Sequence, residues 1–343
     1  MKIGNFEIGN KCFIIAELSA NHNGCIDTAI KTIHAAKEAG ADAIKLQTYT
    51  PDTITMNIKS NDFKIQGTVW DGKYLYDLYN EAYTPWEWHK ELFSVAKKIG
   101  LEIFSSPFDN TAVDFLEKLN VPAYKIASFE ITDIPLIRYV AKKAKPIILS
   151  TGIATKEDIE LALREIKKAG NHDIILLKCT SSYPAPLIDA NLSMIHRFKE
   201  DYQVVVGLSD HTLGITAPVV ATALGAKVIE KHFILDKSLG GPDAGFSLDP
   251  NEFKQMVEAV RNAECSLGSE DYTPNEKILK SRVFSRSLYF NKNLKAGDII
   301  NSDSFRSIRP GHGLHPKHSD SIIGKTVKVD IKKGDRVSWS VIN

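Results

Sequence analysis

The sequence predicts an α/β fold, a (β/α)8 TIM barrel followed by a small C-terminal β-rich domain. Eight short apolar runs alternate with helical patterns through about residue 265, which is the order of elements that such a barrel needs. The runs are apolar throughout rather than alternating, so both faces of each strand should be covered, as in a parallel sheet. No glycine-rich dinucleotide turn follows any run, which disfavours an open doubly wound sheet.

Each predicted strand is a mostly apolar run that ends in polar residues. In chain order the runs read CFIIAE (12–17), ADAIKLQT (41–48), LEIFSS (101–106), PAYKIAS (122–128), KPIILST (145–151), DIILLKCT (173–180), QVVVGLS (203–209) and AKVIEKH (226–232). Because parallel strands of a barrel end at one mouth, we expect the polar side chains at these ends, Lys178 and Lys231 included, to converge there.

Helical patterns with recognisable starts separate the strands. Segment 27–40 has an apolar stripe and Asp27 as a candidate N-cap. Further helices should begin at Thr155 and at Asp249, because an acidic residue stands three positions after each, as in a capping box. Residues 50–83 are too long for a simple loop and should hold short helices over one barrel mouth.

The chain changes character after the barrel. We expect a catalytic barrel over 1–265, a polar linker over 266–280 that carries Gly and Pro, and a small domain over 281–343. Within that domain NLKAGDII (293–300) resembles DIKKGDRV (330–337). This weak repeat, each copy with a Gly-Asp turn, predicts a β-rich and pseudo-symmetric unit.

Composition narrows the class of protein. The net charge of +1 gives no general attraction to nucleic acid or to an anionic membrane, so an anionic substrate must be held by local charge. No stretch has the length and apolar character of a signal peptide or a membrane span. The four cysteines are far apart and form no CxxC pair. These features predict a cytoplasmic protein without a disulfide framework or a structural zinc site.

Two histidines follow neighbouring predicted strands. His211 lies in LSDHT (208–212) and His232 in VIEKHF (228–233). With a carboxylate such as Glu17, two neutral imidazoles would make a divalent-metal site of Lewis-acid type, for Mn²⁺, Zn²⁺ or Fe²⁺. The alternative is that each histidine is a hydrogen-bonded residue at a strand end.

Lysines and serines stand at the ends of other predicted strands. Their positive charge and hydroxyl donors suit a phosphate-bearing anion. The residues are Lys45, Lys125, Ser128, Ser150 and Ser209. The alternative is that Lys45 and Lys125 pair with Glu17 or Glu130, since a lysine buried without a partner is costly.

An ordered set of motifs resembles the sialic acid synthase family. It comprises IIAELSANHNG, GADAIKLQTYTP, SSPFD, YKIAS, STGIAT, CTSSYPAP, GLSDHT, VIEKHF and GGPD, and it covers the whole barrel. The tail with SIRPGHGLHP resembles the family's C-terminal domain, which is like type III antifreeze proteins. Single motifs of this kind are weak evidence, whereas the ordered set is specific.

The resemblance implies that phosphoenolpyruvate condenses with an acetamido-sugar aldehyde to give a nine-carbon 2-keto acid and phosphate. It implies a divalent metal on His211 and His232, with Mn²⁺ expected first and Mg²⁺ or Co²⁺ as alternatives, and Glu17 as a third catalytic residue. The implied phosphoenolpyruvate-binding residues are Lys45, Ser106, Lys125, Ser128, Ser150 and Ser209. The implied sugar-binding residues are Gln47, Glu130, Tyr183, Asp243 and Arg309. Arg309 would come from the partner subunit, which implies a domain-swapped homodimer.

Details of the motifs bear on the sugar. ELSANH, TPWEWH and GLHPK favour a branch of the family that takes a 6-deoxy diacetamido sugar over the N-acetylneuraminate branch. N-acetylneuraminate and legionaminic acid synthases stay as alternatives. Neuraminate synthases carry an Asn ahead of the Tyr-Pro where this chain has Thr180-Ser181-Ser182. Two readings outside the family remain: a carbohydrate-binding tail on an inert barrel, and a metal-dependent aldolase that uses pyruvate.

Overall fold

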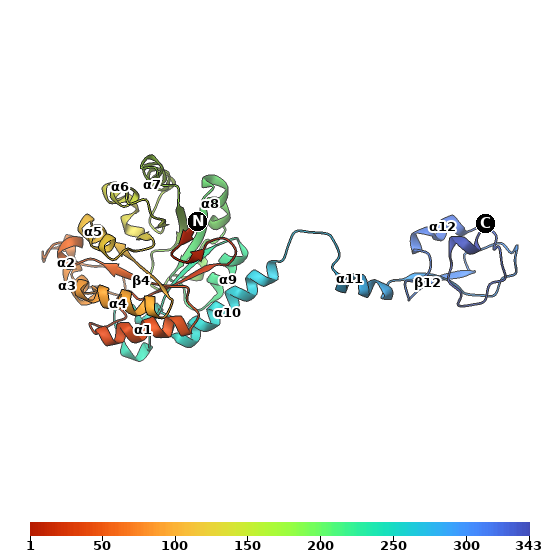
Figure 1. Cartoon of the computed structure of the whole chain (residues 1–343), viewed down its shortest axis with the longest axis horizontal. Coiled ribbons are helices and arrows are strands. Elements are labelled where there is room, and N and C mark those ends of the chain that lie inside the picture. Colours follow the sequence, from red (N-terminus) through yellow and green to blue (C-terminus); the bar gives the residue numbers. More distant parts are fainter. The chain divides into compact units, whose positions relative to one another are not determined.

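The structure is a computed structural model that describes all residues, 1–343. It divides into two compact units, Met1–Gly268 and Ser269–Asn343. The first unit contains a closed ring of parallel strands surrounded by helices, and the second is a small unit with a two-stranded antiparallel sheet (Figure 1). The predicted fold class is therefore confirmed. No helix has both the length and the apolar character needed to cross a membrane.

The barrel closes when its last strand pairs with its first. Its eight strands are β3 (Phe13–Glu17), β4 (Ala43–Thr48), β5 (Glu102–Pro107), β6 (Tyr124–Ile126), β7 (Ile147–Ser150), β8 (Ile174–Cys179), β9 (Val205–Asp210) and β10 (Val228–His232). In the closing pair, His232 of β10 lies opposite Glu17 of β3. A preceding hairpin joins β1 (Lys2–Ile3) to β2 (Phe6–Glu7), and Ile3 is buried in the barrel core.

Helices cover the outside of the barrel. They are α1 (Ile26–Glu38), α4 (Trp86–Lys98), α5 (Asn110–Lys118), α6 (Ile134–Ala141), α7 (Lys156–Lys168), α8 (Met194–Tyr202), α9 (Thr216–Ala223) and α10 (Pro250–Leu267). The capping boxes predicted at Thr155 and Asp249 are present. Asp27 is not an N-cap, because α1 begins one residue earlier with Cys25 at the cap. Asp27 lies instead in the first turn, where its negative charge interacts favourably with the positive end of the helix dipole.

Short helices lie in the connections that follow the strands. Between β4 and α4 the chain forms α2 (Pro51–Ile54), a 3-10 turn (Asn61–Phe63) and α3 (Leu75–Ala82), as expected for that long segment. Further 3-10 turns are Ser128–Thr132, Leu187–Asp189, Lys237–Leu239 and Ala244–Phe246. Each of these follows the carboxyl end of a barrel strand, which is the side that carries active sites in this fold.

The second unit has its own apolar core and shows the internal repeat. Its elements are α11 (Glu276–Ser281), β11 (Ser287–Phe290), β12 (Phe305–Ile308), α12 (Ser319–Ile322) and 3-10 turns at Arg282–Phe284, Pro316–His318 and Trp339–Val341. The two Gly-Asp turns use the same bond: Asp298 accepts from the Lys295 N–H at 2.6 Å, and Asp335 from the Lys332 N–H at 2.7 Å. Leu294 and Ile331 bridge the two copies.

Candidate active site

Side chains from most barrel strands line one cavity at the carboxyl ends. Its lining is Glu17, Lys45, Gln47, Lys125, Ala127, Ser128, Ser150, Cys179, Tyr183, Ser209, His211, Glu230 and His232. The predicted convergence is therefore observed for most of the candidate residues. The open space is only about 50 Å³, because charged side chains fill the cavity by pairing with one another.

Three buried ion pairs lie in the cavity: Lys45 pairs with Glu17, and Glu230 pairs with both Lys45 and Lys125. Lys45 Nζ lies 2.6 Å from Glu17 Oε2, and both side chains are buried. Burial raises the pKa of Glu17 to about 7, against the lowering effect of Lys45. Burial alone would lower the pKa of Lys45, but the charges of Glu17 and Glu230 raise it above the ordinary value. Gln47 donates to Glu17 Oε1 at 2.9 Å and holds that carboxylate from the other side.

Glu230 is a functional candidate that the sequence reading missed. Its Oε1 lies 3.7 Å from Lys45 Nζ and 3.6 Å from Lys125 Nζ, and it accepts a 3.1 Å hydrogen bond from Ser209. The alternative expectation, that Lys45 pairs with Glu17, is met, whereas Lys125 pairs with Glu230 and not with Glu130. Glu230 could have been found from the period-two alternation of side chains in VIEKHF, because Glu230 and His232 must lie on the same face of the strand.

The two histidines face each other across neighbouring strands. Their ring centroids are 5.4 Å apart in an edge-to-face arrangement. His211 Nδ1 donates to the Thr180 carbonyl at 2.9 Å, which leaves its Nε2 free. His232 Nδ1 is buried without a hydrogen-bond partner, and Asp243 Oδ2 lies 3.8 Å away. Burial holds the pKa of His232 well below its ordinary value.

This arrangement fits a cation held by two imidazoles. A neutral His232 has a buried ring nitrogen, Nδ1, that no protein group hydrogen-bonds, so this imidazole can coordinate a cation. No set of three or more His, Cys, Asp and Glu side chains is disposed around one point, so the remaining coordination positions would belong to water and substrate. Cys179 is buried, and its Sγ lies 4.0 Å from His211 Nδ1.

Aromatic side chains cover the histidines. The Tyr183 ring is 4.3 Å from the His211 ring and 5.2 Å from the Phe246 ring. Trp70, from the long segment between β4 and α4, packs 5.6 Å from Tyr183 and donates through Nε1 to the Pro242 carbonyl at 3.1 Å. The sequence predicted that this segment lies over the barrel mouth, but it did not predict that Trp70 holds the segment in place.

A cluster of hydroxyls forms another wall of the cavity. Ser128 Oγ accepts hydrogen bonds from the Ser181 hydroxyl at 2.8 Å and from the Ile153 N–H at 3.1 Å. Ser150 Oγ is buried without a partner. Gly152 lies so close that a Cβ there would stand 2.1 Å from Ser181 Oγ. Ser128 and Ser150 therefore have hydroxyl protons available for a ligand.

Other predicted site residues lie at the edge of this cavity or outside it. Ser106 accepts from Lys45 Nζ at 3.3 Å. Glu130 follows Ser128 in a 3-10 turn, and burial raises the pKa of its carboxyl to about 7. Asp243 is buried beside His232 in the connection after β10. Arg309 belongs to the second unit, where it is exposed.

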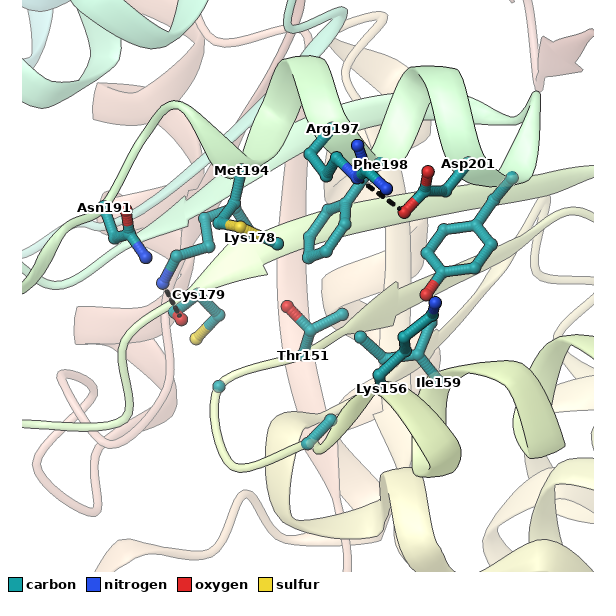
Figure 2. A pocket seen from close by; sticks show the side chains of 13 residues that line it. Thr151, Lys156, Ile159, Lys178, Cys179, Asn191, Met194, Arg197, Phe198 and Asp201 are labelled. Carbon is teal, nitrogen blue, oxygen red and sulfur yellow. Dashed lines mark hydrogen bonds and ion pairs between the residues drawn. The ribbon is translucent and has the colours of Figure 1, made fainter.

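Two lysines at strand ends do not join the cavity, contrary to expectation. Lys231 pairs with Asp210 at 2.5 Å, and neither residue lines the cavity. Lys178 lines a different cavity between α7 and α8, where it donates to the Cys179 carbonyl (Figure 2). Successive residues of a strand point to opposite faces, so the residues next to Glu230 and Cys179 face away from the barrel interior.

The sequence matches known proteins over nearly its whole length. It is 52% identical over 335 residues to a pseudaminic acid synthase of Campylobacter jejuni, which covers 98% of each chain. It is 49% identical over 326 residues to a pseudaminic acid synthase of Helicobacter pylori, covering 95% of this chain and 96% of that one. A Legionella pneumophila N,N'-diacetyllegionaminic acid synthase is 37% identical over 336 residues, with 96% and 94% covered.

Solved structures and family models agree with these relatives. The N-acetylneuraminic acid synthetase of Leptospira borgpetersenii superposes with a TM-score of 0.74 at 34% identity, covering 82% of this chain and 94% of that one. The putative spore coat polysaccharide biosynthesis protein E of Chromobacterium violaceum gives a TM-score of 0.76 at 27% identity, covering 97% and 100%. The NeuB family model matches residues 32–272 and the SAF domain model matches 285–342. The chain belongs to the NeuB family and ends in a SAF domain.

Proposed function

We propose that this chain is a pseudaminic acid synthase, which condenses phosphoenolpyruvate with a 6-deoxy diacetamido hexose of altrose type. The products are a nine-carbon 2-keto sugar acid and phosphate. The observation that carries the proposal is the sequence identity to pseudaminic acid synthases of two species, 52% and 49%, over nearly the entire chain. The cavity described above supplies the groups that this chemistry requires.

Lysines and hydroxyls of the cavity would bind the enol phosphate. Lys45 and Lys125 supply positive charge at a buried position, where an ion pair is little screened. Ser128 and Ser150 supply hydroxyl donors. The Ser209 hydroxyl could donate to the phosphate as well once its hydrogen bond to Glu230 is broken. The incoming anion takes the place of Glu230 between the two lysines, so the site exchanges one set of ion pairs for another.

His211 and His232 would hold a divalent cation, for which Mn²⁺ is the first candidate. A cation there supplies Lewis-acid polarisation of the sugar aldehyde. The chain's own part is to present two ring nitrogens: the His211 Nδ1–H bond to Thr180 sets one tautomer, and burial keeps His232 neutral. Tyr183 and Phe246 limit the access of bulk water to these rings.

Glu17 would act on the reacting carbon centre. C3 of phosphoenolpyruvate attacks the aldehyde carbon, C2 becomes electron-poor, water adds to C2, and the adduct loses phosphate to give the keto acid. The Glu17 carboxylate stabilises positive charge at C2. Its pKa of about 7 also suits transfer of a proton at neutral pH.

The sugar would lie on the outer side of the cavity. Gln47, Glu130, Tyr183 and Asp243 are the candidates for contacts with its hydroxyl and acetamido groups. Thr180-Ser181-Ser182 stands where neuraminate synthases carry an Asn ahead of the Tyr-Pro, which favours a different sugar. The aromatic surface of Tyr183, Trp70 and Phe246 suits a 6-deoxy methyl group, because a site built around hydroxyls would reject it.

Phosphate release tests this proposal. The enzyme is incubated with phosphoenolpyruvate, a divalent metal and a panel comprising the diacetamido altrose, the legionaminic acid precursor and N-acetylmannosamine. We expect the diacetamido altrose to give the highest kcat/KM. His211→Ala and His232→Ala should remove turnover, whereas His196→Ala, which changes an exposed histidine of α8, should not. Preference for another sugar, or full turnover by either variant without added metal, would contradict the proposal.

A homodimer would complete the site. Exposed apolar side chains stand on connections that follow four adjacent strands at the mouth, and a second copy would cover them. They are Phe129, Ile153, Leu187, Ile188 and Leu213. Arg309 from the tail of the partner would contact the sugar's acetamido group. Sedimentation should give a dimer, and Arg309→Ala should raise the KM for the sugar while phosphoenolpyruvate binding is retained.

A further inference from the structure

A second cavity lies between α7 and α8, on the outer side of the barrel wall beside the carboxyl ends of β7 and β8 (Figure 2). Its volume is about 460 Å³, which is within the range of small-molecule sites, about 300–1,000 Å³. Phe198 points into it from α8, and Ile159 borders it from α7. Cys179 lines both this cavity and the reaction cavity.

Positive charge predominates in its lining. Lys156, Lys178 and Arg197 stand against one carboxylate, Asp201. Arg197 uses Nε to bond Asp201 at 2.9 Å, which leaves its two terminal nitrogens available. Lys156 has only a distant partner, Glu160, at 3.7 Å.

Lys178 is the most unusual of the three cations. It is half-buried and forms no ion pair with any carboxylate of the chain. Its Nζ donates only to neutral groups, the Cys179 carbonyl at 2.6 Å and the Thr180 hydroxyl at 3.1 Å. Burial lowers its pKa, and only the Cys179 thiol acts against this; no carboxylate of α7 or α8 does. A cation withdrawn from water without a counter-charge is costly, and a bound anion would remove that cost.

The contacts of Lys178 also lead to the reaction site. The Thr180 whose hydroxyl it holds accepts, through its carbonyl, the hydrogen bond of His211 Nδ1 at 2.9 Å. Thr180 therefore links Lys178 to the group that orients His211.

We propose that the cavity between α7 and α8 binds a small organic anion. Lys178 and Arg197 contact its carboxylate or phosphate group, and Ile159, Met194 and Phe198 contact its apolar or sugar body. Two sources share this chemistry: a sugar carboxylate of nonulosonic type, and a three-carbon phosphate such as phosphoenolpyruvate. The binding itself does not depend on the reaction proposed above.

Calorimetric titration separates this site from the reaction cavity. All variants carry Lys125→Gln, which weakens anion binding in the reaction cavity. The probes are N-acetylneuraminate, phosphoenolpyruvate and inorganic phosphate. We expect one equivalent of an organic anion to bind, and the added change Lys178→Gln to weaken it about tenfold or more, as loss of a charge-assisted contact does. The control is Lys199→Gln, an exposed lysine on α8 that does not line the cavity.

Each result decides the question. Tighter binding of N-acetylneuraminate identifies a sugar-acid site, and tighter binding of phosphoenolpyruvate identifies a site for the phosphorylated substrate. Equal affinity with and without Lys178→Gln overturns the proposal, as does binding of inorganic phosphate alone. Nitrogen chemical shifts of the His211 ring report the link: the ligand should move them in the Lys125→Gln protein and not after Lys178→Gln. Because no turnover is measured, failure here leaves the proposed synthase reaction untouched.

Discussion

The hydroxyl of Ser181 donates a 2.8 Å hydrogen bond to the hydroxyl oxygen of Ser128. Ser128 Oγ also accepts the Ile153 N–H, so both of its acceptor positions are filled. Its own proton is then free to point at an anion in the reaction cavity. Ser181 thus acts as a positioning residue through Ser128.

Ser181→Ala should weaken phosphoenolpyruvate binding without removing chemistry. A hydrogen bond of this kind is worth about 1 kcal/mol, so we expect KM for phosphoenolpyruvate to rise about fivefold, with kcat nearly unchanged. Ser181→Thr keeps the hydroxyl and should restore the KM. Steady-state kinetics measure the split. An equal KM in Ser181→Ala would show that Ser128 is oriented by other contacts.

Gly152→Ala should damage the same wall by steric contact. A Cβ at residue 152 would stand 2.1 Å from Ser181 Oγ and 2.6 Å from Ser128 Oγ. We expect both hydroxyls to be displaced and phosphoenolpyruvate affinity to fall more than in Ser181→Ala. Gly245→Ala is the matched control, because nothing lies within 4 Å of its added Cβ. Titration calorimetry compares the two variants, and equal affinity would place the phosphate elsewhere.

Glu230→Gln should make the thermal stability of the protein depend more strongly on bound phosphoenolpyruvate. The change leaves Lys125 without its buried counter-charge, and breaking such a pair costs about 3 kcal/mol. Phosphoenolpyruvate supplies the missing negative charge, so it should raise the Tm of Glu230→Gln by more than it raises that of the wild type. Glu258→Gln changes an exposed glutamate of α10 and serves as the control. A smaller ligand effect in Glu230→Gln would mean that the anion does not take the place of Glu230.

The contributions of His22 and His89 to stability should fall as pH drops from about 6.5 toward 4, opposite in sign to those of Glu17 and Glu130, whose raised pKa values favour the folded state as pH falls. Burial lowers the pKa of His22 and of His89 to about 4, against about 6.5 in the unfolded chain. In that window each of these histidines binds a proton more readily in the unfolded chain, so acid weakens its contribution to stability. Above pH 6.5 that contribution is fully present. His89 Nε2 lies 2.8 Å from the Thr48 hydroxyl. Protonation of the unfolded His89 should lower the unfolding free energy by up to about 3 kcal/mol across this window.

Urea unfolding at several pH values measures this effect. His89→Gln should show a shallower loss of unfolding free energy between pH 6.5 and 4 than the wild type. His172→Gln, which changes an exposed histidine, should keep the wild-type slope. An unchanged slope in His89→Gln would mean that His89 is protonated in the folded state.

The order of elements was predictable because each signal is local. Apolar runs, the caps at Thr155 and Asp249, and the turns of the C-terminal repeat depend on neighbours in sequence, and the structure has them where they were expected. Polar residues at the strand ends also indicated the mouth of the barrel. Asp27 shows the limit of such signals, since a residue suited to a cap can stand in the first turn instead.

The partners of the charged groups depended on tertiary structure. In runs that are apolar on both faces, the pattern does not mark which face turns inward, so Lys178 could not be assigned to the outer side of the wall. Glu230 differs, because it shares a strand face with His232, which was already expected at the mouth. Barrel closure sets that register, and it brings Lys125 to Glu230 from strands more than 100 residues apart. Trp70 reaches Tyr183 for the same reason. Local sequence thus determined the elements and the chemistry at their ends, whereas the closure of the sheet decided which of those groups meet.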